Sequence, residues 1–410
     1  MDEQRARWVG EAMRQAGYSA LVCRLPQNLV LLTGYQPILG NSFAVVTVEG
    51  DGALRTVRLV VPEDEADLVP AGTAVEMRTF SEETLDSIST TIPSVRAPLD
   101  EMLRAAGVAN GALVGYEGGN LPVAAYYTQI GLPGETTVAL LRDLLPGAHL
   151  HDATDLLEEL AATKTDGELA RIREAEELAR IGFDAARATI QIGVTEAEVA
   201  AAVTQAMLAA GYALPGAHHI TPHVHVMAGV RSAWAYKAFN LTSNYALQRG
   251  DPVSVQLEIA IDGYWAELTR PFFSDVIGDT WRTAHAACLH AQDAALRVIR
   301  AGATGKAADA AARDVLTERG LGQYFKHGLG HGFGFQAINH AAQPILHPAS
   351  RSVLAAGMVC NMEPAVYIEG HGGMRLNDDV LVLAEGNELL SRAIPRDLEY
   401  LVVKERSAVV

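Results

Sequence analysis

The chain has 410 residues, of which 49% are hydrophobic and 20% charged, so it is long enough for two globular domains with sizeable cores. Its net charge of −17 argues against nucleic acid or an anionic membrane surface as a partner, because phosphate binding needs clustered Lys and Arg. No stretch has the roughly 18 apolar residues of a membrane span, and three widely separated cysteines are typical of a reducing compartment, so we expect a cytoplasmic protein.

Residues 1–152 alternate short apolar runs with amphipathic segments, which predicts a mixed sheet covered by helices. We expect helices at Asp2–Ala16, Glu82–Ile88 and Leu99–Ala106, and strands at Ala20–Cys23, Asn28–Gly34, Phe43–Val48, Thr56–Val61 and Ala112–Tyr116. Nothing in this half carries chemistry by itself.

Residues 153–410 contain an approximate internal duplication. A long helix is expected from Asp166, and Thr195 begins a capping segment for the next helix. A second pair of helices is expected at Thr280–Ile299 and Gly305–Glu318. Because each pair neighbours a strand-rich segment, the pattern predicts two similar halves.

Between the halves, residues 216–229 hold four histidines: His218, His219, His223 and His225. Their spacing is not the i, i+4 helical pair of many zinc sites, and no Cys, Asp or Glu lies among them. We therefore favour a hydrogen-bonded strand and loop over a metal site here.

A predicted hairpin follows. Apolar and polar residues alternate from Val253 to Ala260, and Asp262-Gly263 is typical of a type I′ turn. Gln256 and Glu267 would then lie on paired strands, where both side chains could point into one pocket. The alternative is an ordinary hairpin with a solvated polar face.

Three later segments carry further polar side chains. His327 and His331 lie among four glycines, where the backbone can approach a ligand closely. Glu363 interrupts an apolar run, and Arg375 and Asn377 precede the last predicted strand. Two carboxylates, a histidine and an arginine suit the binding of a cationic amine, amidine or guanidine.

Together with the hairpin, these segments resemble the pita-bread family of methionine aminopeptidase, aminopeptidase P, prolidase and creatinase, over residues 155–405. The resemblance implies an α/β two-domain fold. Residues 1–152 would form a creatinase/prolidase-like mixed α/β domain. Residues 153–410 would form a pita-bread domain, a curved antiparallel sheet with two helix pairs.

The metallopeptidases of that family hold two metal ions with two Asp, one His and two Glu. The corresponding places in this chain are Gln256, Glu267, His331, Glu363 and Asn377. Two anionic ligands are thus replaced by amides, whereas a two-metal site needs carboxylates to offset about four positive charges. We expect no metal and no other cofactor, with a single ion on the remaining Glu, His and Glu as an alternative.

Creatinase also lacks the two-metal ligand set. The resemblance therefore implies a metal-independent hydrolase or lyase acting on a C–N bond of a small nitrogenous metabolite, such as an amidine, guanidine or cyclic amino-acid derivative. Glu267, Glu363 and His331 would be catalytic. One alternative is an Xaa-Pro-type metallopeptidase with an altered single-metal site, and another is an inactive binding or scaffold protein of the same fold.

Other residues are assigned by the same resemblance. The family histidine is either replaced by Tyr236 or displaced by an insertion in the loop that follows. Tyr236 and His327 are secondary acid/base candidates. His340 resembles the histidine that follows the glycine-rich segment in the peptidases. The predicted substrate-binding residues are Arg375, Gln256, Asn377, His340, Tyr35 and Phe43.

The last two of these belong to the loop Tyr35–Phe43. In creatinase and prolidase this loop reaches the active site of the partner subunit, so the resemblance implies a homodimer in which Tyr35, Asn41 or Phe43 contacts substrate. A plain surface loop is the alternative.

Overall fold

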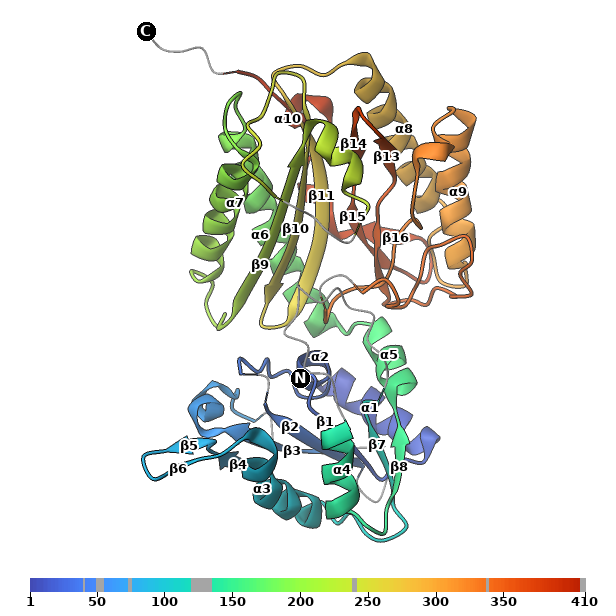
Figure 1. Ribbon diagram of the computed structural model, residues 1–410. Coiled ribbons are helices and arrows are strands. Elements are labelled where there is room, and N and C mark those ends of the chain that lie inside the picture. Colours follow the sequence, from blue (N-terminus) through green and yellow to red (C-terminus); the bar gives the residue numbers. More distant parts are fainter. Residues whose placement is uncertain are drawn as a thin grey trace. The chain divides into compact units, whose positions relative to one another are not determined.

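A computed structural model describes residues 1–39, 41–48, 55–72, 76–118, 135–237, 242–336 and 339–405. Its internal contacts divide these residues into two compact units, one extending to Ala161 and the other beginning at Ala162 (Figure 1). Helix α5 (Thr154–Ala162) therefore falls almost wholly in unit 1. The division at residues 152 and 153 stays a prediction of where two autonomous domains would separate.

Unit 1 is built on a six-stranded sheet of order β4-β3-β2-β1-β7-β8. Strand β2 is antiparallel to β1 and β3, whereas β7 is parallel to β1 and β8, and β4 is parallel to β3. The strands are β1 (Ala20–Cys23), β2 (Phe43–Val48), β3 (Arg55–Pro62), β4 (Glu76–Phe80), β7 (Leu113–Tyr116) and β8 (His149–Asp152). The helices, besides α5, are α1 (Glu3–Ala16), α2 (Pro26–Thr33), α3 (Thr91–Ala105) and α4 (Glu135–Leu144). Helices α3 and α4 share a core with the sheet, and the predicted mixed α/β unit is confirmed.

Residues 28–33 belong to helix α2 rather than to the strand predicted at Asn28–Gly34. Pro26 lies in the first turn of α2, where its missing N–H costs no hydrogen bond. The carboxylate of Glu117 accepts hydrogen bonds from the backbone N–H groups of Arg24 and Leu25, just before the helix. Gly34 ends α2 with a left-handed φ of 77°.

The helix predicted at Glu82–Ile88 is also wrong. The chain forms a short hairpin of β5 (Glu83–Thr84) and β6 (Ser87–Ile88). The hydroxyl of Thr84 accepts hydrogen bonds from the backbone N–H groups of Asp86, at 3.3 Å, and Ser87, at 3.1 Å. Such local side-chain bonds compete with helix formation. The neighbouring helix α3 was predicted, but it begins eight residues before Leu99, at Thr91.

Unit 2 contains the sheet β17-β11-β10-β9, the sheet β12-β15-β16 and the pair β13-β14. The strands are β9 (Ile220–Ala228), β10 (Pro252–Ile261), β11 (Tyr264–Ser274), β12 (Val359–Met362), β13 (Ala365–Ile368), β14 (Gly372–Arg375), β15 (Asp378–Val382), β16 (Asn387–Leu389) and β17 (Val402–Val403). The helices are α6 (Asp166–Thr189), α7 (Glu196–Gly211), α8 (Asp279–Leu296), α9 (Gly305–Glu318) and α10 (Leu398–Leu401). The pairs α6–α7 and α8–α9 lie beside the strands in Figure 1, so both predicted helix pairs are confirmed.

The hairpin of β10 and β11 has one apolar and one polar face. Val253, Val255 and Leu257 belong to the core shared with the helices. The turn has positive φ at both Asp262 (50°) and Gly263 (85°), as a type I′ turn requires. The predicted hairpin is therefore confirmed, and its polar face lies opposite the helix-packed face.

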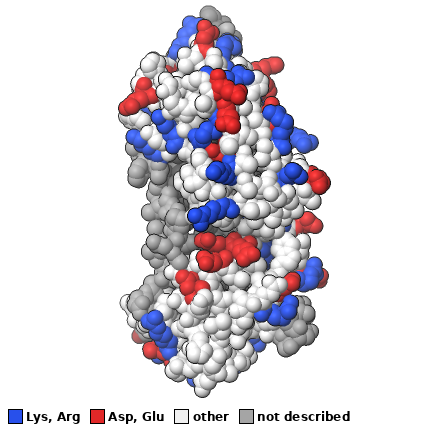
Figure 2. Space-filling view, turned by 90° about the vertical axis from the view of Figure 1, so that its right-hand side faces the viewer, with Lys and Arg blue, Asp and Glu red and all other residues white. Residues whose placement is uncertain are grey.

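Charged side chains of both signs are interspersed on the face drawn in Figure 2. This face shows no continuous field of Lys and Arg of the kind that binds a phosphate backbone. Within the described residues, no helix combines the length and the apolar character that a bilayer crossing needs.

Candidate active site

The polar face of the hairpin is the base of the candidate site. Gln256 lies opposite Thr269, and Glu258 lies opposite Glu267. Antiparallel partners share a face, and so do residues two apart on one strand, so all four side chains point the same way. The prediction put Gln256 and Glu267 on paired strands, which is confirmed, but the register makes Glu258 the direct neighbour of Glu267.

Arg375, the last residue of β14, supplies a fixed positive charge. Its Nη1 lies 3.1 Å from Oε2 of Glu363, its Nη2 donates to Oε1 of Gln256, and its Nε donates to Oγ1 of Thr269 at 3.2 Å. Burial alone would lower the pKa of Arg375, but Tyr367 and the nearby carboxyl groups raise it above its ordinary value. The guanidinium is therefore charged and already engaged on three sides.

His331 is held in one orientation. Its Nδ1 lies 2.9 Å from the carbonyl oxygen of Gly332, and its Nε2 lies 3.2 Å from the amide nitrogen of Asn361. This arrangement fits a neutral ring that donates from Nδ1 and accepts at Nε2. Oε1 of Glu267 is 3.8 Å from the same Nε2. Burial lowers the pKa of His331, so at neutral pH the ring can accept a proton.

The glycines around His331 are required by close backbone packing. A Cβ at Gly330 would lie 2.1 Å from the carbonyl oxygen of Asn361, and one at Gly332 would lie 1.9 Å from that of Gln343. Both contacts are far inside van der Waals distance, so only glycine is accommodated. The motif therefore holds the histidine against β12.

Three buried carboxyl groups surround the single guanidinium. Burial raises the pKa of Glu267 and of Glu363 to about 7, although Arg375 opposes the shift at both. Burial, and then the neighbouring Glu267, raises the pKa of Glu258 well above its ordinary value. Desolvation and like charge both disfavour the ionised form. The cluster thus contains more carboxyl groups than its one arginine can neutralise.

Two carboxyl oxygens of this cluster accept no hydrogen bond within the described structure. Oε1 of Glu258 accepts a bond of 2.5 Å from Nε2 of Gln256, but Oε2 accepts none, and the nearest basic nitrogen, Nε2 of His225, is 3.5 Å away. Oε2 of Glu267 also accepts none. Buried polar atoms without a partner are rare in proteins, so these two oxygens indicate a ligand position.

Asn377 lies beside the same cluster. Its backbone forms an antiparallel bridge with Thr269, which places its side chain on the polar face. The residue is fully buried, and neither side-chain amide atom has a hydrogen-bond partner in the described structure. Asn377 therefore remains a predicted substrate-binding residue.

The secondary candidates lie around this centre. Nε2 of His327 lies 3.2 Å from the hydroxyl of Tyr367, whose ring centroid is 5.2 Å from that of Tyr236. The ring centroid of His340 is 5.1 Å from that of His331. Burial lowers the pKa of His327 to about 3 and that of His340 to about 4. Tyr236 is 38% exposed, so this row of rings leads from the surface toward Arg375.

Glu258 and His225 are not among the site residues predicted from the sequence. Strand β9 confirms the strand predicted in the histidine-rich segment, and within it His225 lies opposite Gln256 and His223 lies opposite Glu258. The ring of His223 stacks on Trp265 with centroids 5.6 Å apart. Alternation along the strand already puts Glu258 on the same face as Gln256. What the sequence does not show is the register of the three strands, which places Glu267 and His223 on either side of Glu258.

Tyr35 and Phe43 do not present their side chains to a substrate, contrary to the prediction. Phe43 belongs to the core of unit 1, and Tyr35 is 1% exposed, with its hydroxyl bonded to Glu65. On the same loop, Ile38 and Leu39 are 48% and 52% exposed. The resemblance located the loop but not the direction of its side chains, and both aromatic rings are buried within unit 1.

The residues at the family's metal positions do not fit a two-metal centre. The amide oxygen of Gln256 and one oxygen of Glu363 are taken by Arg375, whose positive charge lies where cations would have to bind. Asn377 supplies no negative charge. Within the described ranges, no three His, Cys, Asp or Glu side chains are arranged to hold a metal ion.

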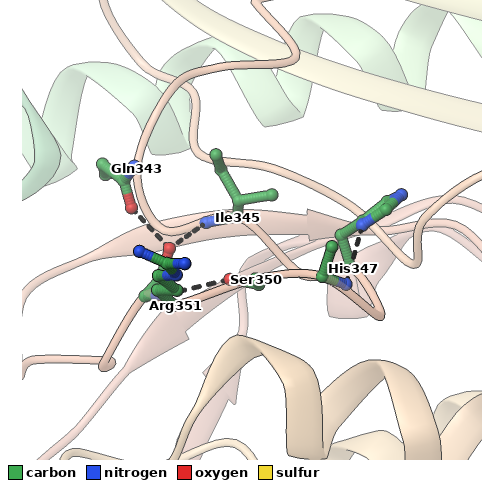
Figure 3. A pocket seen from close by; sticks show the side chains of 7 residues that line it. Gln343, Ile345, His347, Ser350 and Arg351 are labelled. Atoms are coloured by element: carbon green, nitrogen blue, oxygen red, sulfur yellow. Dashed lines mark hydrogen bonds between the residues drawn. The ribbon is translucent and has the colours of Figure 1, made fainter.

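A hollow of about 430 Å³ in unit 2 is lined by residues between 343 and 352 (Figure 3). Several of its polar groups already bond to one another. The hydroxyl of Ser352 donates to Gln343 at 2.5 Å and accepts from the backbone of Ile345, and the hydroxyl of Ser350 accepts from the backbone of Ser352. Because these groups are satisfied locally, we assign the reactive site to the carboxyl cluster instead.

Comparison with known proteins identifies the family of unit 2. The model of metallopeptidase family M24 matches residues 170–384, which contain the hairpin, His331, Glu363 and Arg375. An uncharacterized peptidase of Bacillus subtilis, YqhT, is 31% identical over 173 residues, 42% of this chain and 47% of that protein. An Xaa-Pro dipeptidase of Pyrococcus horikoshii is 30% identical over 167 residues, 41% of this chain and 46% of that protein. The chain thus matches about half the length of these relatives.

Solved structures extend the likeness to both units. The prolidase from Pyrococcus horikoshii OT3 has a TM-score of 0.76 at 24% identity, covering 97% of this chain and all of that one. The prolidase from Pyrococcus furiosus has a TM-score of 0.72 at 25% identity, covering 93% and 99%. The predicted two-domain α/β fold is confirmed by these matches.

Proposed function

Because the chain belongs to metallopeptidase family M24, we propose that it hydrolyses a C–N bond in a small peptide-like substrate, at the cluster formed by Glu258, Glu267, His331 and Arg375. The observation that carries this proposal is the pair of open carboxyl oxygens beside a neutral, oriented histidine. An inactive scaffold has no use for such a cluster, since buried polar groups without partners are costly.

The names of the relatives favour peptides over the metabolites suggested by the creatinase resemblance. Dipeptides, including Xaa-Pro dipeptides, are therefore the first substrate class, and amidines and guanidines come second. The Xaa-Pro metallopeptidase alternative is better supported by the relatives than a metabolite hydrolase is. The proposal that the reaction needs no metal is supported by the engagement of Gln256 and Glu363 by Arg375.

In this proposal His331 is the general base. Nε2 of His331 takes a proton from water as the water oxygen bonds to the carbonyl carbon, and the imidazolium then protonates the leaving nitrogen as the C–N bond breaks. Glu267, 3.8 Å from that Nε2, stabilises the imidazolium while it exists. Positioned proton transfer of this kind contributes about 10²–10⁴-fold to a rate.

The decisive experiment measures turnover of Xaa-Pro dipeptides, other dipeptides and amidines by purified protein, after chelation and again after addition of Mn²⁺ or Co²⁺. We expect hydrolysis of a dipeptide that survives chelation, and metal analysis showing less than one equivalent. Activity that appears only with added metal would instead establish the single-metal peptidase. No turnover of any class under either condition would refute the hydrolase proposal.

We also propose a cytoplasmic homodimer. The support is the family likeness, the three buried free cysteines and the exposed apolar pair Ile38 and Leu39. Sedimentation at micromolar concentration tests the assembly, with Leu39→Asp as the variant expected to weaken it. A monomeric wild-type protein would contradict the dimer.

A further inference from the structure

The sequence suggested that Glu267 and Glu363 together bind a cationic nitrogen group, but Glu363 is not available for this. One of its oxygens lies 3.1 Å from Nη1 of Arg375, which is itself buried. An ion pair removed from water in this way is costly to separate. A second cation would therefore need another carboxylate.

Glu258 has the position that this role requires. It is fully buried, lies directly opposite Glu267 in the hairpin, and shares its face. Side chains opposite each other in an antiparallel pair have Cβ atoms about 4.5–5.5 Å apart, close enough for both carboxylates to contact one small cation. Hydrogen bonding by Gln256 orients Oε1 of Glu258 and leaves Oε2 open.

We propose that Glu258 and Glu267 form a two-carboxylate receptor, through their open Oε2 atoms, for a cationic nitrogen group of the substrate. The proposal rests on the proposed function in taking the cation to be part of the hydrolysed molecule. The shared chemistry is an N–H-bearing cation, which is either the ammonium of a dipeptide or an amidinium. Either one supplies the hydrogen-bond donors and the positive charge that the cluster lacks.

His331 lies on the Glu267 side of this receptor and His225 on the Glu258 side. Burial lowers the pKa of both rings, that of His225 to about 4, so neither competes as a cation at neutral pH. Arg375 is the nearby fixed cation, and it faces Gln256 and Glu363. The receptor is therefore selective for a charged over a neutral ligand of the same shape.

The test compares matched ligand pairs by calorimetry: alanyl-proline against propionyl-proline, and acetamidinium against acetamide. The first of each pair carries the cationic nitrogen group and is the charged member, and the second has nearly the same shape without that group and is the neutral member. Wild type should bind the charged member of one pair about 10- to 100-fold more tightly, since a charge-assisted bond is lost with the neutral member. The pair that shows the preference identifies ammonium or amidinium as the group bound. In Glu258→Gln the preference should disappear, while the neutral member keeps its affinity.

Two variants serve as references. Glu388→Gln removes an exposed carboxylate of unit 2 that pairs with Arg173, and it should keep the full preference. If Glu258→Gln does not fold, Glu258→Asp retains the charge one methylene further back and should show an intermediate preference.

Equal binding of charged and neutral ligands by wild type would overturn the inference, and so would a preference unaffected by Glu258→Gln. Thermal stabilisation of wild type, but not of Glu258→Gln, by Mn²⁺ alone would show that the carboxylates hold a metal ion instead. Turnover without any charge preference would refute this inference and leave the hydrolase proposal standing. A charge preference without turnover would support this inference and refute the hydrolase proposal.

Discussion

Glu117 in unit 1 and Glu258 in unit 2 are both buried carboxyl groups, yet they differ in what satisfies them. Oε1 of Glu117 accepts from the backbone N–H groups of Arg24 and Leu25, and Oε2 accepts from the side chain of Asn28 at 2.5 Å. These donors lie at the start of α2, so the carboxylate serves as a helix cap supplied from a distant segment.

Glu258 has only one such donor, and its neighbour Glu267 also keeps an open oxygen. Burial raises the pKa of Glu117 to about 7, and that of Glu258 also rises, so the pKa does not separate the two roles. The two roles differ in the number of hydrogen-bond donors that each carboxyl group has. A buried acid whose oxygens are all bonded stabilises the fold, whereas paired acids with open oxygens are ready for a ligand.

The largest effect should come from the open site. His331→Ala should lower kcat by about 10²–10⁴-fold with little change in KM, because the proton acceptor is lost while the carboxylates remain. Steady-state kinetics on the best dipeptide gives both constants. His371→Ala, an exposed histidine between β13 and β14, is the matched control and should leave them unchanged. A loss of less than about tenfold would remove His331 from the chemistry.

Arg375→Met should destabilise the protein by about 3–5 kcal/mol, because Glu363 would keep a buried charge without its partner. Urea unfolding followed by circular dichroism measures the change. The control is Arg173→Met, which removes an arginine from an exposed pair with Glu388 and should cost at most about 1 kcal/mol. Similar midpoints for the two variants would mean that the arginine is not the counter-ion of the cluster.

Glu117 should make the stability of unit 1 depend on pH. An ordinary glutamate side chain has a pKa of 4.5, whereas burial raises the pKa of Glu117 to about 7, so between these values the folded state binds more protons than the unfolded chain. Stability should therefore fall by about 3 kcal/mol as pH rises from about 4.5 to 7. Thermal unfolding of wild type and Glu117→Gln across this range isolates the contribution, since other groups titrate equally in both. If the difference in stability between wild type and Glu117→Gln did not change with pH, the raised pKa assigned to Glu117 would be wrong.

The smallest effect tests one donor of the satisfied acid. Asn28→Ala removes the bond to Oε2 of Glu117 and should cost about 1–3 kcal/mol, toward the upper end above pH 7, where the acceptor is ionised. Denaturant unfolding at pH 5 and pH 8 measures it. Gln15→Ala, which removes an exposed bond to Glu11, is the control and should change stability by less than about 0.5 kcal/mol. An equal loss of unfolding free energy at pH 5 and pH 8 would show that the contribution of Asn28 does not depend on the ionisation of Glu117.

Patterns confined to one element were predictable. Helix α1 ends before Gly17, α7 begins after Thr195, and the β10–β11 turn lies at Asp262-Gly263, because caps and turns depend on residues a few positions apart. The apolar run at Asn28–Gly34 was ambiguous, since it suits a buried strand as well as a helix. What favours the helix is Glu117, about ninety residues further along the chain.

The same division holds for the site. The sequence by itself determined the family likeness and the glycine-flanked His331, because each depends on a short motif. Only the tertiary structure decided that Arg375 forms an ion pair with Glu363, that Glu258 lies opposite Glu267, and that Tyr35 and Phe43 are buried. These outcomes depend on strand register and on which buried charges pair, and both are set by contacts between residues far apart in the chain.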